Sequence, residues 1–263
     1  MVADFIFRFD KPLVATAIHN GHNLPGDFAG SLGIDEQTQL REEDPHTEFF
    51  TFVAPNRITG RCSRFVVDLN RPWRDAVYRK PEDAWGLPVR RQPVSRAMQV
   101  DARIIYDSFY RRTRLMIDEL LRVFPRVFVF DIHSYNHRRG GPKATPDDPA
   151  LNPEIILGAS NMPDAMRPLV EHIQGDLLAF DFGGRALDVR VDVKFTGGHF
   201  PRWLHSTYRG RVACVSVEFK KIFMDEWSGE LNRATRLKLR RALAGTVPGV
   251  LSWLKRDAPP ISV

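Results

Sequence analysis

Four runs of consecutive apolar residues stand out along the chain, and they predict buried β-strands. The runs cover residues 13–18, 64–69, 127–132 and 212–217. Because they are continuously apolar rather than alternating with polar positions, we expect central strands that are covered on both faces. Each run ends at, or is followed directly by, a polar residue able to do chemistry: His19, Asn70, His133 and Glu218. In open α/β sheets ligands bind beyond the carboxyl ends of the strands, so these residues predict one shared site.

Helical periodicity separates these runs. Residues 101–123 carry apolar side chains at helical spacing, which predicts a long helix on the sheet with Asp101 at its N-cap. In residues 233–255 basic side chains alternate with Leu and Ala, as is typical of a helix with a solvated basic face. Residues 73–93 and 138–152 read as long loops, which often serve as lids or binding loops. The alternation predicts an α/β protein, and without an evident linker we expect a single domain over residues 1–263.

Composition narrows the class of protein without choosing a function. The 263 residues are 43% hydrophobic and 27% charged, which excludes disordered and fibrous classes. No window approaches the roughly 18 apolar residues of a membrane span, and the N-terminus lacks an apolar signal core, so we expect a cytoplasmic protein. Cys62 and Cys214 lie in apolar surroundings and predict buried thiols rather than a disulfide framework or a thiolate zinc site. The net charge of +6 is compatible with nucleic acid, a membrane surface or an anionic small molecule.

Histidines and carboxylates supply the donors of a possible metal site. A catalytic zinc takes about three protein ligands, typically His nitrogens and a carboxylate oxygen, with one position left open. His19 and His133 follow predicted strands and suit this role. The segment EEDPHTE offers carboxylates, and His22 forms an HxxH spacing with His19; the candidates left open are Asp44, Glu48, Glu43 and His22.

Glu218 is the candidate general base. A carboxylate at the end of an apolar strand has its pKa raised by desolvation unless it is paired with a cation. Beside a metal site, such a glutamate would accept a proton from water. The alternative is a structural ion pair with a neighbouring lysine or arginine.

Three residues around the predicted strand at 64–69 could bind anions. A guanidinium can hold a carboxylate bidentately or stabilise an oxyanion, and an amide can supplement either role. Arg64, Asn70 and Arg71 are therefore candidates, with surface salt bridges as the alternative for the arginines.

Six segments together resemble the N-formylglutamate amidohydrolase family, in the family's order from residue 18 to 226. They are IHNGHNLP at 18–25, EDPHTEFF at 43–50, SRFVVDLNRP at 63–72, DIHSYN at 131–136, FTGGHFPR at 195–202 and VSVEFKKIFMDE at 215–226. The resemblance implies a fold related to zinc carboxypeptidases and aspartoacylases: three α/β/α layers around a central mixed sheet, of the phosphorylase/hydrolase-like type. One departure is His22, which stands where the carboxypeptidase pattern has a glutamate.

The resemblance also implies a role for each matching residue. His19, Asp44 and His133 would bind one zinc ion per chain, with His22 and Glu48 as less favoured ligands. Arg64 would polarise the scissile carbonyl, Glu218 would activate water, and Asn70 and Arg71 would hold the substrate carboxylate. Gly197 and Gly198 would allow the backbone to approach the site closely.

The implied function is hydrolysis of the amide bond of a small anionic N-acyl amino acid, with N-formyl-L-glutamate giving formate and L-glutamate. No nucleic-acid or membrane partner is expected, and the sequence sets no oligomeric state. One alternative is a zinc carboxypeptidase or deacylase acting on a larger N-acyl or peptide substrate, with the loops at 73–93 and 138–152 setting the pocket size. A basic nucleic-acid-binding module is the alternative from another class, and it would leave His19, His133 and Glu218 unexplained.

Overall fold

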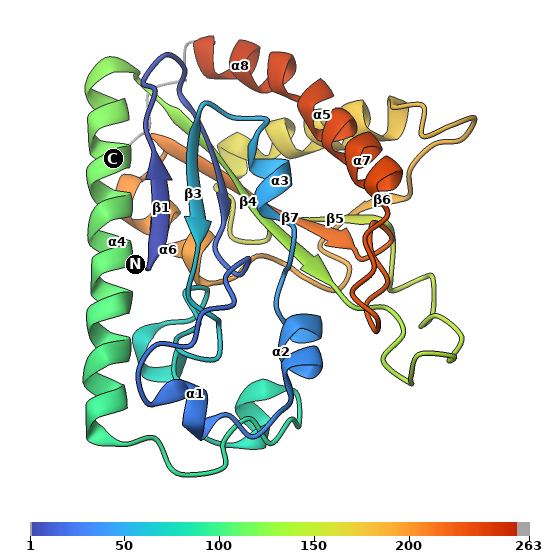
Figure 1. The fold of residues 1–263 in the computed structure, drawn as a ribbon. Helices are drawn as coiled ribbons and strands as arrows, with labels where there is room; N and C mark the ends of the chain where they lie inside the picture. The colour runs from blue at the N-terminus through green and yellow to red at the C-terminus, as the bar shows by residue number, and fades with distance from the viewer. Residues whose placement is uncertain (1, 257–263) are drawn as a thin grey trace.

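A seven-stranded sheet forms the centre of the protein (Figure 1). The computed structural model describes residues 2–256. Along the sheet the strand order is β1-β3-β2-β4-β7-β5-β6. The strands are β1 (Ala3–Ile6), β2 (Leu13–Ala17), β3 (Asn56–Gly60), β4 (Val127–Tyr135), β5 (Ile155–Gly158), β6 (Val189–Val191) and β7 (Val212–Lys220).

The sheet is mixed, as predicted. Strands β3, β2, β4 and β7 are parallel neighbours. Edge strand β1 pairs antiparallel with β3, while β5 pairs antiparallel with β7 and parallel with β6. The parallel centre places the carboxyl ends of β2, β4 and β7 at one edge of the sheet, where side chains from three adjacent strands can meet.

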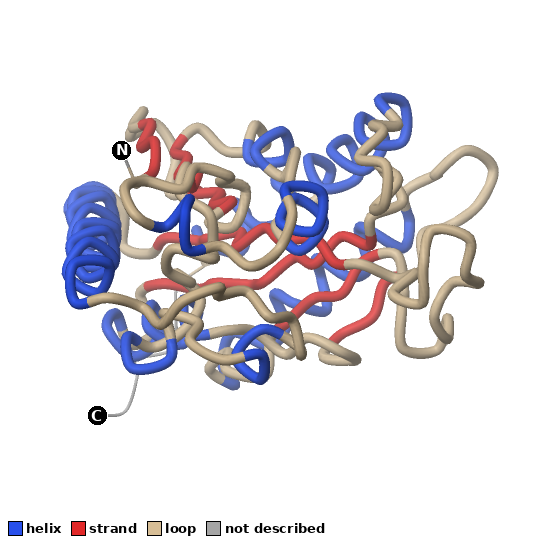
Figure 2. Tube along the Cα trace, turned by 60° about the horizontal axis from the view of Figure 1, so that its bottom comes forward, coloured by secondary structure: helices blue, strands red, loops and turns tan. Residues whose placement is uncertain are grey.

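Helices cover both faces of the sheet, so the predicted three-layer architecture is confirmed (Figure 2). Helices α4 (Arg96–Val123) and α6 (His199–Tyr208) pack on one face. The opposite face is covered by α3 (Glu48–Thr51), α5 (Arg167–Ala179), α7 (Arg233–Gly245) and α8 (Val247–Lys255). The remaining short elements are α1 (Phe28–Ser31), α2 (Glu36–Glu42) and the 3₁₀ turns Trp73–Asp75, Pro81–Ala84 and Asp164–Met166.

Three of the four apolar runs form strands, because each of their faces meets a helical layer. In β4, Phe128 and Phe130 point into the core on the α5 side, whereas Val127 and Val129 point into the core on the α4 side. Full burial of such side chains contributes about 1.5–3 kcal/mol each. The runs at 13–18, 127–132 and 212–217 are confirmed as strands, and β4 and β7 extend further, so that His133 and Glu218 lie inside them.

Two predictions about local structure were wrong. Residues 64–69 form turns rather than a strand, and the strand of this region is β3, immediately upstream. Phe65, Val66 and Val67 are nevertheless fully or almost fully buried, so burial rather than strand pairing accounts for the apolar run. The long helix begins earlier than expected, because the Ser95 side chain accepts a hydrogen bond from the amide of Met98 at 3.1 Å and caps it there.

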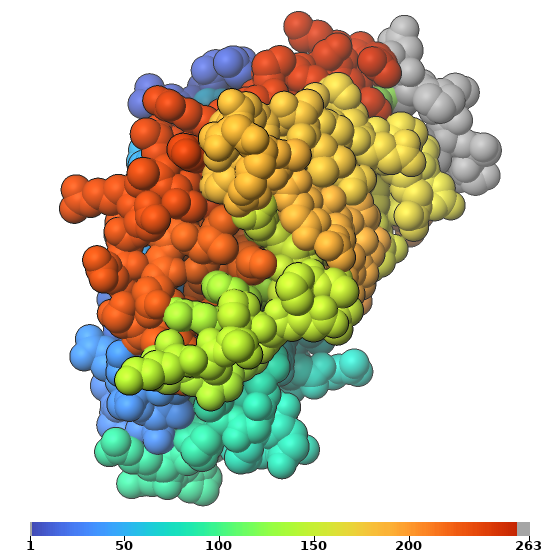
Figure 3. All heavy atoms as spheres, turned by 90° about the vertical axis from the view of Figure 1, so that its right-hand side faces the viewer, coloured from blue at the N-terminus to red at the C-terminus, as the bar shows by residue number. Residues whose placement is uncertain are grey.

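The predicted loops and buried cysteines are present in the structure. Residues 138–152 contain no helix or strand, and residues 73–93 contain only short 3₁₀ turns. Figure 3 shows the loop at 138–152, in yellow-green, between the orange segment that follows β7 and the teal segment around residues 73–93. Cys62 and Cys214 are both buried. Within residues 2–256, no helix combines the length and apolar character needed to cross a bilayer.

Candidate active site

A cavity of about 600 Å³ opens at the carboxyl edge of the parallel strands. The loop after β2 brings His19 to it, β4 brings His133, β7 brings Glu218, and the segment after α2 brings Asp44. His133 and Glu218 are register partners on β4 and β7. Its size falls within the range of small-molecule sites.

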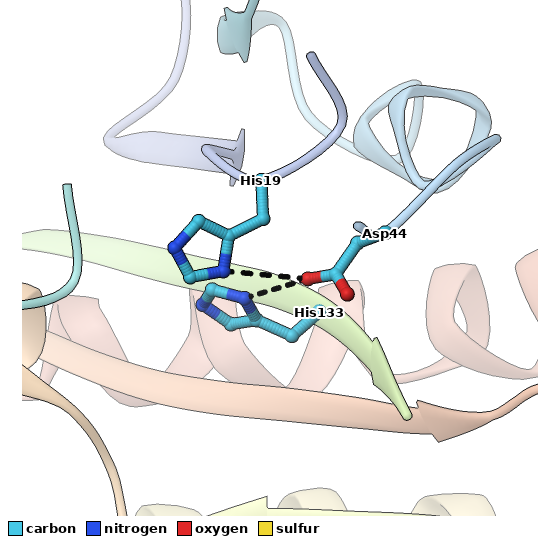
Figure 4. Close-up of side chains that lie close together, drawn as sticks. All are labelled: His19, Asp44 and His133. Atoms are coloured by element: carbon cyan, nitrogen blue, oxygen red, sulfur yellow. Dashed lines mark hydrogen bonds and ion pairs between the residues drawn. The ribbon is translucent and has the colours of Figure 1, made fainter. Parts of the chain in front are cut away.

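His19, Asp44 and His133 form a compact donor group at this cavity (Figure 4). Their ligand atoms all lie within 4.8 Å of one another, and all three residues are buried. The Asp44 Oδ2 atom is 3.1 Å from His133 Nδ1 and 3.5 Å from His19 Nδ1. Two imidazole nitrogens and one carboxylate are therefore directed at a common point.

The outer nitrogen of each imidazole is held by a further carboxylate. His19 Nε2 lies 2.7 Å from Asp68 Oδ1, and His133 Nε2 lies 3.1 Å from Asp131 Oδ2. Asp68 also accepts hydrogen bonds from Tyr78, from Arg64 and from the amide of Asn70. Asp131 accepts hydrogen bonds from the hydroxyl groups of Thr16 and Ser216.

This arrangement fits a metal ion. An Nε2–H that donates to a carboxylate leaves the Nδ1 lone pair of the same ring free, and ligating histidines usually have such a partner. In both rings that lone pair faces the Asp44 carboxylate, so three electron-pair donors face one another and could hold a cation between them. A proton can substitute: burial opposes it, but the Asp131 and Glu218 charges raise the pKa of His133 well above its usual value.

The Asp44 carboxyl is ionised in this setting. Burial by itself would raise its pKa, but the hydrogen bonds with His133 and His19 and the charges of these rings hold the pKa well below its usual range. A permanently charged carboxylate between two imidazoles is a suitable hard donor for a divalent ion.

Glu218 lines the same cavity and titrates differently. Burial raises its pKa to about 7; the charge of His133 opposes the shift, and the carboxylates of Asp44 and Asp131 add to it. A carboxyl group with a pKa near neutrality can both accept and return a proton at physiological pH.

Arg64 and Asn70 also line the cavity. Arg64 donates to Asp68 at 2.9 Å, and its Nε is buried without a hydrogen-bond partner in the described part of the chain. Asn70 Nδ2 lies 3.4 Å from His133 Nε2, and Asn70 Oδ1 accepts from the amide of Phe200 at 2.9 Å. A Cβ atom at Gly198 would lie only 2.1 Å from Asn70 Oδ1, so only glycine permits this approach.

Three other candidates lie apart from the donor group, and none of them lines the cavity. The Arg71 guanidinium stacks 4.4 Å from the Tyr78 ring centroid and has its Nε 3.5 Å from Asp68. His22 hydrogen-bonds with Glu43, the remaining carboxylate candidate, at 2.6 Å. Glu48 forms an ion pair with Arg61 at 2.9 Å.

Sequence reasoning missed Asp68 and Asp131, the carboxylates behind the two histidines. A usable signal was present, since each is a lone acid inside an apolar run, RFVVDL and VFVFDI. A buried carboxylate needs a partner, and the histidines were the available ones.

Fold and site together define an α/β protein with a potential metal-binding group at the carboxyl edge of a mixed sheet. Residues 11–224 match the family model described as N-formylglutamate amidohydrolase, and the chain therefore belongs to this family. The resemblance inferred from the six segments is confirmed, and membership supports an enzyme that hydrolyses an amide bond.

Solved structures share the fold at low sequence identity. An N-formylglutamate amidohydrolase from Ralstonia eutropha JMP134 is 16% identical, with a TM-score of 0.76 over 97% of this chain and 98% of that one. The gene product Atu2144 from Agrobacterium tumefaciens is 16% identical, with a TM-score of 0.59 over 95% of this chain and 96% of that one. A metallo-carboxypeptidase from Burkholderia cenocepacia, at 10% identity, reaches a TM-score of 0.38 over 92% of this chain and 56% of that one, a likeness too distant to carry an argument. No curated protein matches the chain in sequence.

Proposed function

We propose that this protein is a metal-dependent amidohydrolase that converts N-formyl-L-glutamate and water into formate and L-glutamate. The observation that carries the proposal is the position of Glu218, whose strand register partner is the histidine His133 of the donor group. A proton-accepting carboxyl beside two imidazoles and a carboxylate is the arrangement that metal-assisted hydrolysis requires.

His19, Asp44 and His133 would hold one zinc ion, which when bound would polarise the formyl carbonyl and make water more acidic. Asp68 and Asp131 fix the two imidazole rings from behind, so that both Nδ1 atoms keep their direction. His22 and Glu48 are not part of this proposed ligand set, because each is engaged with another partner.

Glu218 accepts a proton in the first step of the reaction and donates it in the second. Its carboxylate takes a proton from the attacking water while the water oxygen forms a bond to the formyl carbon. The same proton then passes to the glutamate nitrogen as the C–N bond breaks, so the carboxylate is regenerated. Arg64, whose buried Nε has no hydrogen-bond partner among the described residues, stabilises the negative charge that develops on the carbonyl oxygen.

Substrate carboxylate binding by Asn70 and Arg71 is the assignment that the family motif suggests, and it stays a prediction. The cationic side chains that line the cavity itself are Arg64, Arg139, Lys194 and Lys221. Among residues 2–256, the one hydrogen-bond acceptor of Lys194 is the neutral Asn152 side chain, at 2.7 Å, so its charge is available to an anionic substrate.

The test is metal analysis of the purified protein together with formate and amine release from N-formyl, N-acetyl and N-succinyl amino acids. We expect about one zinc per chain and preferred cleavage of N-formyl-L-glutamate. Metal-free protein with undiminished activity would refute the proposed chemistry, and preference for a larger acyl group would move the substrate assignment.

A further inference from the structure

Asn136 lies at the cavity with a hydrogen-bonding group that the fold does not use. It follows the last residue of β4, is 3% exposed and lines the cavity. Its Oδ1 atom is buried and has no hydrogen-bond partner among residues 2–256. Native proteins pair the great majority of buried polar atoms, so an unpaired atom at a cavity requires an explanation.

Other buried asparagines in this protein have partners. Asn56 accepts hydrogen bonds from the amides of Arg8 and Phe9 through Oδ1 and donates to the carbonyls of Lys11 and Leu13. That side chain ties the start of the sheet together. The Oδ1 atom of Asn136 makes no such contribution. An apolar side chain of similar shape would avoid the free-energy cost of desolvating this atom.

The substrate can supply the missing hydrogen-bond partner of Asn136 Oδ1. An unpaired carbonyl-type oxygen needs a donor, and an N-acyl amino acid with ionised carboxylates has one strong donor, its amide N–H. That nitrogen is bonded to the acyl carbon, which must lie at the His19–Asp44–His133 group for hydrolysis. Asn136 lies three residues after His133, just past the end of β4, and it lines the same cavity.

We propose that Asn136 is a substrate-binding residue whose Oδ1 accepts a hydrogen bond from the N–H of the scissile amide. The inference rests on the proposed amidohydrolase function and deepens it. Once the tetrahedral species has formed, this hydrogen bond keeps the N–H directed at Asn136, and the nitrogen lone pair therefore points away from Asn136. The lone pair is then free to take the proton from Glu218 as the C–N bond breaks.

The test compares an amide with an ester that lacks the N–H. Wild-type protein and Asn136→Leu are assayed on N-formyl-L-glutamate and on the O-formyl ester of 2-hydroxyglutarate. In the variant we expect kcat/KM to fall about ten- to a hundredfold for the amide, the size of effect that leaving a buried donor unpaired produces. The ester should change little, so the amide-to-ester ratio falls.

Thermal unfolding supplies a readout independent of activity. Asn136→Leu should melt at the same temperature as the wild type or higher, because the fold loses no hydrogen bond of this oxygen. Asn56→Leu is the matched control: it should melt at a markedly lower temperature and leave the amide-to-ester ratio unchanged.

The possible outcomes distinguish a failure of the Asn136 assignment from a failure of the proposed function. If the wild type cleaves the amide and Asn136→Leu lowers amide and ester rates equally, the hydrogen bond to N–H is disproved while the function stands. A strongly reduced melting temperature with an unchanged ratio assigns Asn136 a structural role instead. If the wild type cleaves no N-acyl amino acid, the proposed function fails, and this assignment fails with it.

Discussion

At the level of single residues, the cavity contains two kinds of functional group. One kind consists of donors that could bind a cation, and the other is a carboxyl group suited to proton transfer. Asp44 is held ionised by its two histidine neighbours, whereas burial raises the pKa of Glu218 to about 7. The two carboxyls lie in one cavity but in different local fields, which is the usual way that a site assigns different roles to chemically identical groups.

Glu218→Gln tests the proton-transfer role. Glutamine keeps the shape of the side chain but cannot accept a proton, so kcat should fall about a hundred- to ten-thousandfold with little change in KM. Zinc content and melting temperature should stay close to wild type, because no ion pair of Glu218 occurs among the described residues. A variant that is fully active but thermally weakened would remove Glu218 from the mechanism.

The choice between Arg71 and Lys194 is also a question about single residues. Arg71 lies against Tyr78 and Asp68, whereas Lys194 lines the cavity with a neutral partner. We expect Lys194→Gln to raise KM for N-formyl-L-glutamate about tenfold, the loss of one charge-assisted hydrogen bond at an exposed position. Arg71→Lys is the comparison, measured by the same initial-rate assay. A steep rise in KM from Arg71→Lys alone would support the motif-based assignment.

At the level of elements, the sequence predicts β2, β4 and β7 because each is apolar on both faces and ends close to a polar residue. It does not reveal that residues 64–69 form turns, since burial without strand pairing produces the same apolar run. That difference matters for the site. The turn brings Asp68 to His19 and Arg64 to the cavity, contacts that local sequence patterns do not encode.

Helix α6 supports an open stretch of β7 through His205. The Nε2 atom accepts a hydrogen bond from the Cys214 amide at 3.0 Å, and Nδ1 lies 2.9 Å from Asn161 Oδ1. Strand β5 pairs with β7 only from Ser216 onward, so the imidazole serves a backbone amide upstream of that pairing. Protonation of Nε2 would replace this hydrogen bond with repulsion.

The His205 contact predicts a pH dependence of stability. Burial lowers the pKa of His205 to about 4, below the ordinary value of 6.5, so the unfolded chain binds a proton first as the pH falls. Stability from this group is therefore complete above pH 6.5 and is lost as the pH falls towards 4, by up to about 3 kcal/mol. Urea unfolding of wild type and His205→Gln between pH 7 and 4 should show a smaller decline in the variant. His172→Gln, at an exposed position of α5, is the control and should follow the wild type.

At the level of the whole molecule, the site depends on strand order and register, which single elements do not determine. The sequence places His19, His133 and Glu218 near strand ends, but only the neighbouring positions of β2, β4 and β7 bring them to one cavity. The sequence alone does not decide which carboxylate of EEDPHTE is the ligand, because Asp44 and Glu48 lie only four residues apart. In the fold, Asp44 faces the two histidines while Glu48 pairs with Arg61.

Metal binding should accordingly stabilise the whole chain, because the donors come from segments distant in sequence that only the folded protein brings together. A ligand that binds only the folded state adds about RT ln(1 + [L]/Kd) to the free energy of unfolding, roughly 4 kcal/mol at a thousandfold excess over Kd. Removing zinc with a chelator should thus lower the melting temperature of the wild type by several degrees, and adding zinc should restore it.

Two variants test which carboxylate binds the metal. Asp44→Asn should bind zinc weakly and show little response to the chelator. Glu48→Gln should respond as the wild type does, since the Glu48 carboxylate contacts Arg61 rather than the histidines. The same scan on His133→Ala checks the second donor. If Glu48→Gln loses the response and Asp44→Asn keeps it, the carboxylate ligand is Glu48, and the convergence of Asp44 with the two histidines has another purpose.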